Sequence, residues 1–158
     1  MKKLFITAAI ATLFSASVFA DGSKKAATTV NVSTSVTTQF NANFVDAKNV
    51  TWTVDRNFQK ADFIMNGVKG TAFYNLQGEF VALTENVDVT AIPAKTRQEI
   101  AEKYKGYNVN DVFVVQNNTD LNPDADETAY FVDLKNGSKE VLVKITPELH
   151  AELFKTIK

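Results

Sequence analysis

Apolar and polar residues alternate along the middle of the chain, between residues 50 and 89. Because successive side chains of a β-strand point to opposite faces, this period of two predicts strands that are covered on one face only. Turn-forming pairs interrupt the alternation at Arg56-Asn57, Asn66-Gly67 and Gln77-Gly78. Asn-Gly is the strongest of these signals, since both central residues of a type I′ turn need a positive φ. The pattern predicts four antiparallel strands joined by two-residue turns.

These turns determine which side chains share a face of the predicted sheet. One face is almost entirely apolar and carries Val50, Trp52, Val54, Ala61, Phe63, Met65, Val68, Ala72, Tyr74, Val81 and Leu83. The opposite face mixes aromatic, charged and hydroxyl side chains. A slip of one residue in a turn would exchange the two faces of the strand that follows it.

A helix is predicted on each side of this meander. Residues 37–48 contain Phe40 and Phe44, whose i, i+4 spacing places both rings on one helix face. Pro93 precedes the second predicted helix, over residues 94–104.

A second group of strands is predicted after that helix, over residues 109–118 and on both sides of Asn136-Gly137. Its apolar face would carry Phe113, Val115, Tyr130, Val132, Leu134, Val141, Val143 and Ile145. The last segment, residues 147–158, fits two interpretations. Thr146-Pro147 is typical of a helix start, whereas a repeat of the first meander needs an eighth strand here, and the repeat favours the strand.

The sequence thus predicts an α+β fold, a tandem repeat of a helix packed on a four-stranded antiparallel meander sheet. The first repeat would cover residues 37–90 and the second residues 91–158. Each has too few large apolar side chains to outweigh the conformational entropy of ordering it, so neither is expected to fold alone. The preceding residues 21–36 are rich in Ser, Thr and small side chains and predict a linker, although their alternating valines also fit an added edge strand.

Residues 1–20 have the pattern of a secretory signal peptide: two lysines, an apolar run, and the small-x-small sequence Val18-Phe19-Ala20. The apolar run is too short to span a bilayer comfortably, and it is removed with the signal peptide. No stable membrane anchor is therefore expected after signal-peptide removal. We therefore expect a periplasmic or secreted protein. The chain has no cysteine and hence no disulfide, and loss of Lys2 and Lys3 moves its formal net charge from −1 to −3. No basic stripe is present, so nucleic acid is not an expected partner.

Several of these motifs resemble one protein family. They are Val50-x-Trp52, Asn66-Gly67, Phe73-Tyr74-Asn75-x-x-Gly78, and Tyr130-x-Val132-x-Leu134 before a second Asn-Gly. Together they resemble the PepSY-like, beta-lactamase-inhibitor-like exported proteins of Bacteroidetes-type bacteria, over residues 37–158. The resemblance implies helix-plus-sheet modules that bind proteins or peptides, and it implies no catalytic residues. The final hairpin departs from the family pattern, because Pro147-Glu148-Leu149 stands where a tighter turn is usual.

Catalytic chemistry finds little support in the residue types. The chain has a single histidine, His150, no cysteine, and no Gly-rich phosphate loop. An enzyme is not expected, and no cofactor is implied.

One acidic segment has the spacing of a calcium loop. Oxygen-bearing side chains alternate at Asp120, Asn122, Asp124 and Asp126, as they do where such loops begin. Ala125 stands where the turn glycine is needed and Phe131 where the bidentate glutamate is needed. A solvated hairpin loop is the favoured interpretation, with calcium binding as the alternative.

The open face of the first predicted sheet is the candidate interaction surface. It combines aromatic and polar side chains, as protein-binding surfaces do, at Thr51, Thr53, Phe58, Lys60, Asp62, Phe73 and Phe80. The alternative is that this face packs against the second repeat. We expect an exported, non-enzymatic protein that binds a protein or peptide of the cell envelope, as an inhibitor or regulator of a peptidase or another envelope enzyme. A small-ligand or calcium carrier, and a structural envelope protein, are the alternatives.

Overall fold

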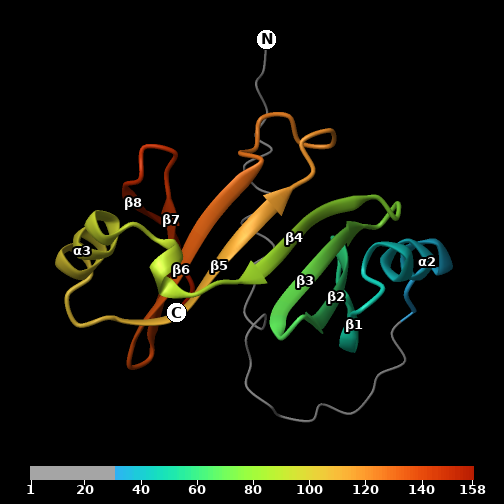
Figure 1. Cartoon of the computed structure of the whole chain (residues 1–158), viewed down its shortest axis with the longest axis horizontal. Coiled ribbons are helices and arrows are strands. Elements are labelled where there is room, and N and C mark those ends of the chain that lie inside the picture. The colour runs from blue at the N-terminus through green and yellow to red at the C-terminus, as the bar shows by residue number, and fades with distance from the viewer. Residues whose placement is uncertain (1–30) are drawn as a thin grey trace. The chain divides into compact units, whose positions relative to one another are not determined.

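A computed structural model describes residues 31–158 of the chain (Figure 1). The predicted signal peptide and residues 21–30 of the predicted linker lie outside the described residues. The helices are α2 (Thr34–Asn43), the short 3-10 helix η1 (Val89–Ala91) and α3 (Ala94–Lys103). The strands are β1 (Lys48–Val54), β2 (Phe58–Met65), β3 (Val68–Asn75), β4 (Phe80–Asn86), β5 (Asn108–Asn117), β6 (Thr128–Asn136), β7 (Lys139–Ile145) and β8 (Ala151–Thr156).

The predicted fold class is wrong. All eight strands belong to one sheet, in which they follow one another in chain order from β1 to β8. Within residues 31–158, two α-helices of ten residues each accompany them. The fold is thus β-rich, and not a tandem repeat of a helix on a separate four-stranded sheet. The physical reason lies at the end of the first meander. The last strand of such a meander has unpaired N–H and C=O groups along its outer edge, and here the next strand of the chain pairs with them.

The described chain divides into two compact units, which are not continuous in sequence. The first unit ends at Leu83 and also includes Asn118–Ala125, and the second comprises Thr84–Asn117 and Asp126–Lys158. Strand β4 therefore contributes residues to both units.

Helix α2 and the first three strands form the core of the first unit. Its buried residues are Val36, Phe40, Phe44, Ala61, Phe63, Ala72 and Tyr74, which matches the predicted apolar face of β2 and β3. The helix begins three residues before its predicted start, because the Ser33 hydroxyl accepts a hydrogen bond from Val36 N and caps it. Thr34–Val36, predicted as linker, are thus helical.

Two of the three predicted turns have the predicted length. Met65 pairs with Val68 around Asn66-Gly67, and Asp55 N donates to Phe58 O around Arg56-Asn57. The third turn is longer, because Asn75 N donates to Glu79 O and leaves three residues in the loop. Gly78, at φ +91°, occupies the position of such loops that needs a left-handed backbone.

The second unit buries Ile92 and Ile100 against strands β5 to β8, with Val112, Val132, Leu134, Val141, Val143, Ile145 and Ala151. Two residues of its predicted apolar face were assigned wrongly. Phe113 and Val115 lie on the opposite face from this cluster, because β5 has an irregularity between Val109 and Asp111 and Val112 pairs with Val132. Residues 151–156 form the strand that the repeat favoured.

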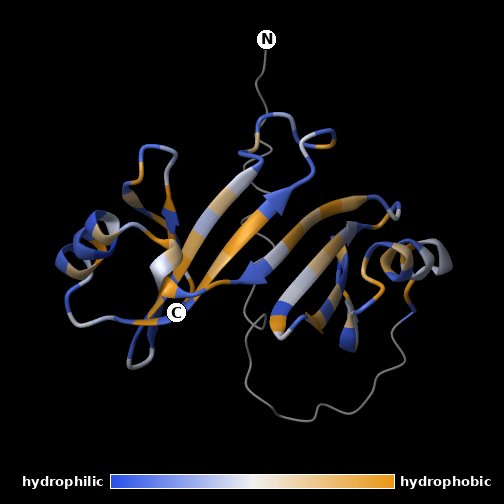
Figure 2. Ribbon diagram, in the orientation of Figure 1, coloured by the Kyte–Doolittle hydropathy of each residue, from blue (hydrophilic) through white to orange (hydrophobic). Residues whose placement is uncertain are grey.

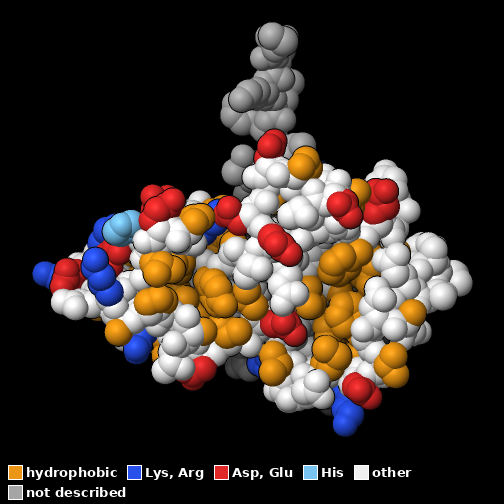
Figure 3. Space-filling model, turned by 45° about the horizontal axis from the view of Figure 1, so that its top comes forward, with side chains coloured by type: hydrophobic (Ala, Val, Ile, Leu, Met, Phe, Trp, Pro, Cys, Tyr) orange, Lys and Arg blue, Asp and Glu red, His pale blue; other side chains and the backbone are white. Residues whose placement is uncertain are grey.

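Figure 2 colours the ribbon by hydropathy, and Figure 3 shows hydrophobic side chains exposed among polar and charged ones on the face that it draws. Hydrophobic and hydrophilic residues mix along the strands, while the loop between β5 and β6 is mostly hydrophilic (Figure 2). Among residues 31–158, no helix is long and apolar enough to cross a membrane.

Candidate functional site

Six of the seven predicted partner-binding residues share one face of β1, β2 and β3. Thr53 pairs with Lys60, which pairs with Phe73 on the next strand, and Thr51 pairs with Asp62. Residues opposite one another in neighbouring strands point to the same face, so the register brings these side chains together. Phe58 belongs with them, because its ring contacts the Phe73 ring edge-on with centroids 6.2 Å apart.

The exposure of these six residues is uneven. Phe58 is 7% exposed and Phe73 is fully buried, whereas Thr51 and Thr53 are exposed. Lys60 lies 3.2 Å from Asp55, and Thr71 donates a 2.6 Å hydrogen bond to Asp62. Burial raises the pKa of Asp62, and this hydrogen bond opposes the rise. The accessible part of this face is therefore its threonine edge on β1, and a role in partner binding stays a prediction.

Phe80 lies elsewhere than predicted. The longer loop after Asn75 shifts the register of β4, so that the Phe80 ring contacts Tyr74, with centroids 5.6 Å apart, and packs against the core under α2. At Phe80 the longer loop thus exchanges the face that the side chain occupies, whereas Leu83 packs against the core under α2 as predicted.

Phe80 lies in a groove of about 600 Å³ within the first unit. One wall is α2, which contributes Ser35, Gln39 and Asn43 at i, i+4 spacing. The loop between β3 and β4 and the segment 118–121 form the rest. The complete lining is Ser35, Gln39, Asn43, Gln77, Gly78, Glu79, Phe80, Asn118, Asp120 and Leu121.

Hydrogen bonds and close packing fix the walls of this groove. Asn118 donates two hydrogen bonds to β4, from its backbone N–H to Val81 O and from its side-chain amide to Phe80 O, each 2.8 Å long. At Gly78 the loop approaches the helix so closely that a Cβ there would lie 3.3 Å from Ser35 Oγ. The buried Gln59 holds the start of the helix, because its Oε1 accepts from Ser33 N at 2.8 Å and its Nε2 donates to Asn75 O. The groove is therefore largely formed before any ligand binds.

The predictions did not include the carboxamides of this groove. Gln39, Asn43 and Gln77 are exposed, and their side chains make no hydrogen bond within residues 31–158. The spacing of Ser35, Gln39 and Asn43 was visible in the sequence, but the partner wall is remote in the chain and has no local signal.

The candidate calcium residues are divided between the two units. Asp120 lines the groove, while Asp126 makes a 2.5 Å ion pair with Lys144 in the second unit. Within the described part of the chain, no three His, Asp or Glu side chains are grouped so that they could hold a metal ion. Calcium binding by Asp120, Asn122, Asp124 and Asp126 thus stays a prediction without a formed site.

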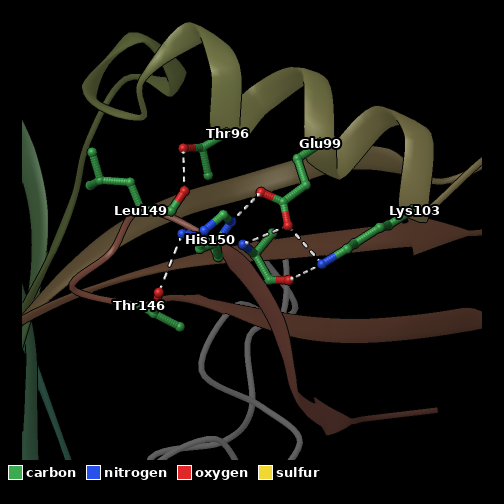
Figure 4. Close-up of polar contacts among 7 residues, drawn as sticks. Thr96, Glu99, Lys103, Thr146, Leu149 and His150 are labelled. Carbon is green, nitrogen blue, oxygen red and sulfur yellow. Dashed lines mark hydrogen bonds and ion pairs between the residues drawn. The ribbon is translucent and has the colours of Figure 1, made fainter.

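His150 belongs to a polar cluster that joins α3 to the turn between β7 and β8 (Figure 4). Its Nδ1 lies 3.3 Å from Glu99 Oε2, and Glu99 Oε1 accepts a 2.6 Å hydrogen bond from Lys103. The hydrogen bond from Lys103 lowers the pKa of Glu99. The buried Thr96 hydroxyl donates to Leu149 O at 2.6 Å.

This cluster has a structural explanation. Leu149 has φ +66°, a conformation that is uncommon for a side chain of its type, and the contacts with α3 hold its backbone there. Thr146 Oγ1 accepts from the backbone N–H of His150, so it serves the turn as well. None of the contacts made by His150 orients it towards a nucleophile in the described chain.

Two buried polar atoms lack a hydrogen-bond partner among the described residues: the Tyr74 hydroxyl and Asp133 Oδ1. Burial raises the pKa of Tyr74 to about 12. Burial also raises the pKa of Asp133, whose other oxygen accepts a 2.7 Å hydrogen bond from Asn110.

Comparison with known proteins yields the fold but no family. No protein-family model matches the chain, and no curated protein matches it. Solved structures from Bacteroides do match. A DUF2874 family protein from Bacteroides uniformis is 20% identical with a TM-score of 0.62, over 79% of this chain and 88% of that chain. A proposed periplasmic protein from Bacteroides eggerthii is 17% identical with a TM-score of 0.64, over 80% and 88% of the two chains.

The third structure is relevant to the predicted beta-lactamase-inhibitor-like resemblance, because it is described as BLIP-like. It is a BLIP-like protein from Bacteroides fragilis, 15% identical with a TM-score of 0.62, over 81% of this chain and 88% of that chain. At these identities the likeness establishes a shared fold. It supports the beta-lactamase-inhibitor-like part of the predicted resemblance, whereas the PepSY-like part stays a prediction. The chain thus has the fold of these BLIP-like and DUF2874 proteins.

Proposed function

We propose that the chain is an exported, non-catalytic protein that binds a protein or peptide in the cell envelope through the groove beside α2. The observation that carries this proposal is the groove itself, with its fixed walls and its free carboxamides. Export is supported by the N-terminal pattern of the sequence and by the proposed periplasmic protein that shares the fold. The BLIP-like neighbour supports binding to a protein.

The chemistry of the groove favours a polypeptide ligand. A carboxamide both donates and accepts hydrogen bonds, so Gln39, Asn43 and Gln77 complement the N–H and C=O groups of an extended backbone. Phe80 and Leu121 add an apolar contact, as in other sites where aromatic groups lie among polar ones. Because hydrogen bonds already fix the walls, binding would cost little ordering of the groove's backbone.

The charges of the groove favour a basic segment of that polypeptide. Glu79 and Asp120 are its charged lining residues, and both are acidic. A lysine or arginine of the partner would place its charge near them, and arginine would pair with either carboxylate through two parallel hydrogen bonds. The finer form of the proposal is inhibition of a peptidase or another envelope enzyme. If the bound segment belongs to such an enzyme, holding it in the groove would keep it from taking part in catalysis.

Affinity capture with a matched pair of variants tests the proposal. Residues 21–158 are immobilised and exposed to envelope extract of the source organism, as wild type, as Gln39→Ala/Asn43→Ala, and as Gln98→Ala/Glu102→Ala. Both double variants remove exposed polar side chains at i, i+4 on a helix, but the second pair lies on α3. The expected result is one protein that the wild type and the α3 variant retain and the α2 variant loses. Retention by all three would refute the groove as the binding site.

The enzyme activity of any retained protein, measured with and without the chain, then tests inhibition. Unchanged activity at saturating chain would leave a binding protein without an inhibitory role.

A small polar ligand is the second candidate, and the volume of the groove favours it. Pockets that hold small molecules span roughly 300–1,000 Å³, and this groove is about 600 Å³. Dialysis of small molecules from the same extract against the wild type and the α2 variant separates the two candidates. A bound small molecule together with an empty affinity column would replace the protein-binding proposal.

A further inference from the structure

Strand β1 forms one end of the sheet. Lys48 and the bulge between Lys48 and Thr51 protect its start, but from Thr51 to Val54 its outer edge has no charge, no proline and no bulge. Among residues 31–158, β1 pairs with β2 alone, and it is exposed at all positions except the half-buried Trp52. Edge strands are normally protected by charged side chains, proline or bulges. Between Val50 and Val54 the sequence Val-Thr-Trp-Thr-Val contains no charge and no proline.

The hydrogen bonds of the hairpin show which backbone groups point outward. Asp55 N donates to Phe58 O, so Asp55 and Phe58 are a hydrogen-bonded pair. Hydrogen-bonded and non-hydrogen-bonded pairs alternate in antiparallel sheets. Trp52 with Ala61 and Val54 with Gln59 are therefore non-hydrogen-bonded pairs. In such pairs the backbone N–H and C=O groups point away from the neighbouring strand, so those of Trp52 and Val54 point away from β2. Among residues 31–158 the sheet has no strand beyond β1 with which these groups could pair.

The exposed run is a palindrome centred on Trp52. In an antiparallel pair of two such strands, related by a two-fold axis at Trp52, each residue meets its own type. Trp52 lies opposite Trp52, Thr51 opposite Thr53, and Val50 opposite Val54. Such self-complementarity is the requirement of a two-fold symmetric interface.

The direction of the outward-pointing N–H and C=O groups of β1 agrees with this register. A residue on the two-fold axis of an antiparallel pair can exchange both hydrogen bonds with its copy only if its N–H and C=O point towards the partner, as those of Trp52 do. Thr51 and Thr53 then form the close, non-hydrogen-bonded pairs, in which two threonines are a favourable combination. Asn49, at φ +55°, and the bulge between Lys48 and Thr51 end the ladder on one side.

We propose that two copies of this chain associate through antiparallel pairing of their β1 strands, centred on Trp52. This surface is separate from the groove, so the association is independent of the proposed function. The ladder is only five residues long, which is far less contact than a stable permanent dimer needs, and the association is therefore weak and depends on concentration.

A charge-swap pair of variants tests both the pairing and its register. In the proposed register Thr51→Lys/Thr53→Lys places like charges directly opposite one another at both Thr pairs. Thr51→Lys/Thr53→Glu places opposite charges there instead. Both positions are exposed, and both variants change the same two side chains, so their melting temperatures provide the control for folding.

Sedimentation equilibrium of residues 21–158, from micromolar to millimolar concentration, gives the readout. The expected result is a wild-type average mass that rises towards twice that of one chain, a Lys/Lys variant that keeps the mass of one chain, and a Lys/Glu variant that associates at least as well as the wild type. A wild type that keeps the mass of one chain throughout overturns the proposal, and so does a Lys/Lys variant that still associates. Loss of association in both variants would overturn the register. The Gln39→Ala/Asn43→Ala variant should associate as the wild type does.

Discussion

Single side chains set the pH dependence of this molecule in two opposite directions, and Asp55 is the first example. Its Oδ1 accepts hydrogen bonds from Asn57 N at 2.8 Å and Phe58 N at 2.9 Å, and its Oδ2 lies 3.2 Å from Lys60. Burial alone would raise the pKa of Asp55, but these hydrogen bonds together lower it. The stability that they provide is thus present above the ordinary value of 3.8 and is lost as the pH falls through the lowered pKa.

We predict that Asp55→Ala lowers the free energy of unfolding by about 1 kcal/mol at pH 7, because the turn between β1 and β2 loses its acceptor. Asp55→Asn keeps the Oδ1 acceptor and should lose less. Urea titrations at pH 7 and pH 3 check this, and the loss caused by Asp55→Ala should be smaller at the lower pH. Equal losses at the two pH values would contradict a role for the ionised carboxylate.

Asp133 has the opposite effect on how stability depends on pH. It is 2% exposed, its Oδ1 has no hydrogen-bond partner among the described residues, and burial raises its pKa. A raised pKa means that folding favours the protonated acid, so the favourable contribution is complete below the ordinary value of 3.8 and is lost as the pH rises through the raised pKa.

Asp133→Asn should therefore stabilise the protein at neutral pH, by about 1 kcal/mol, because the amide keeps the acceptor for Asn110 and removes the buried charge. The same urea titrations measure it. The gain should shrink towards pH 3, and a variant that is less stable than the wild type at pH 7 would show that the charge itself is needed.

At the scale of elements, the two glycine turns of the first unit differ in what surrounds them. Gly67 and Gly78 both have a positive φ, but a Cβ at Gly67 meets no atom within 4 Å, whereas one at Gly78 lies 3.3 Å from Ser35 Oγ and 3.5 Å from Val36 Cγ2. The β3–β4 turn is thus packed against α2, while the β2–β3 turn is open.

Both Gly→Ala substitutions should cost roughly 1 kcal/mol for the backbone conformation. Gly78→Ala should cost more, because the side chain of Ser35 has to give way, and it should also weaken binding in the groove. Thermal unfolding of the two variants measures the difference. If Gly67→Ala were as damaging as Gly78→Ala, contact with the helix would not be the cause.

The same two turns show how far the sequence predicts this fold. Asn-Gly fills both left-handed positions of a two-residue loop, so the pairing of Met65 with Val68 was predictable. Gln77-Gly78 supplies a glycine that fits a two- or a three-residue loop, and the choice follows from its packing on α2, which no local pattern encodes. That one residue moved Phe80 to the helix side and into the groove.

The groove was beyond sequence analysis for a related reason. Asn118 meets Phe80 across 38 positions of the chain, and its hydrogen bonds to the backbone of β4 need no particular residue there. The alternating pattern predicted the strands and most of the core under α2, because burial on one face leaves a period of two.

At the scale of the whole molecule, the chain passes between the two units three times, after Leu83, after Asn117 and after Ala125. A cut near residue 90 would therefore not separate complete units. Residues 31–90 would lack Asn118, which bonds to β4, and residues 91–158 would lack Asn86, whose amide donates a 2.6 Å hydrogen bond to Asp111.

We predict that neither fragment folds cooperatively by itself. Circular dichroism during urea titration, of each fragment and of an equimolar mixture, is the measurement, with residues 21–158 as the control. A cooperative transition in either fragment alone would show that the exchanged segments are dispensable.

The two outer strands of the sheet are unequal, since β8 carries Glu152 and Lys155 while β1 between Val50 and Val54 is uncharged. In the terms of polymer chemistry, a unit with two reactive ends grows into a chain, whereas a unit with one reactive end stops at a pair. Among residues 31–158, the uncharged stretch from Val50 to Val54 of β1 is the part of an outer strand that we propose can pair further. Association of the chain would therefore end at two copies and leave a soluble product, and a second open edge, created by neutralising the charges of β8, would turn the same chain into a fibre-forming monomer.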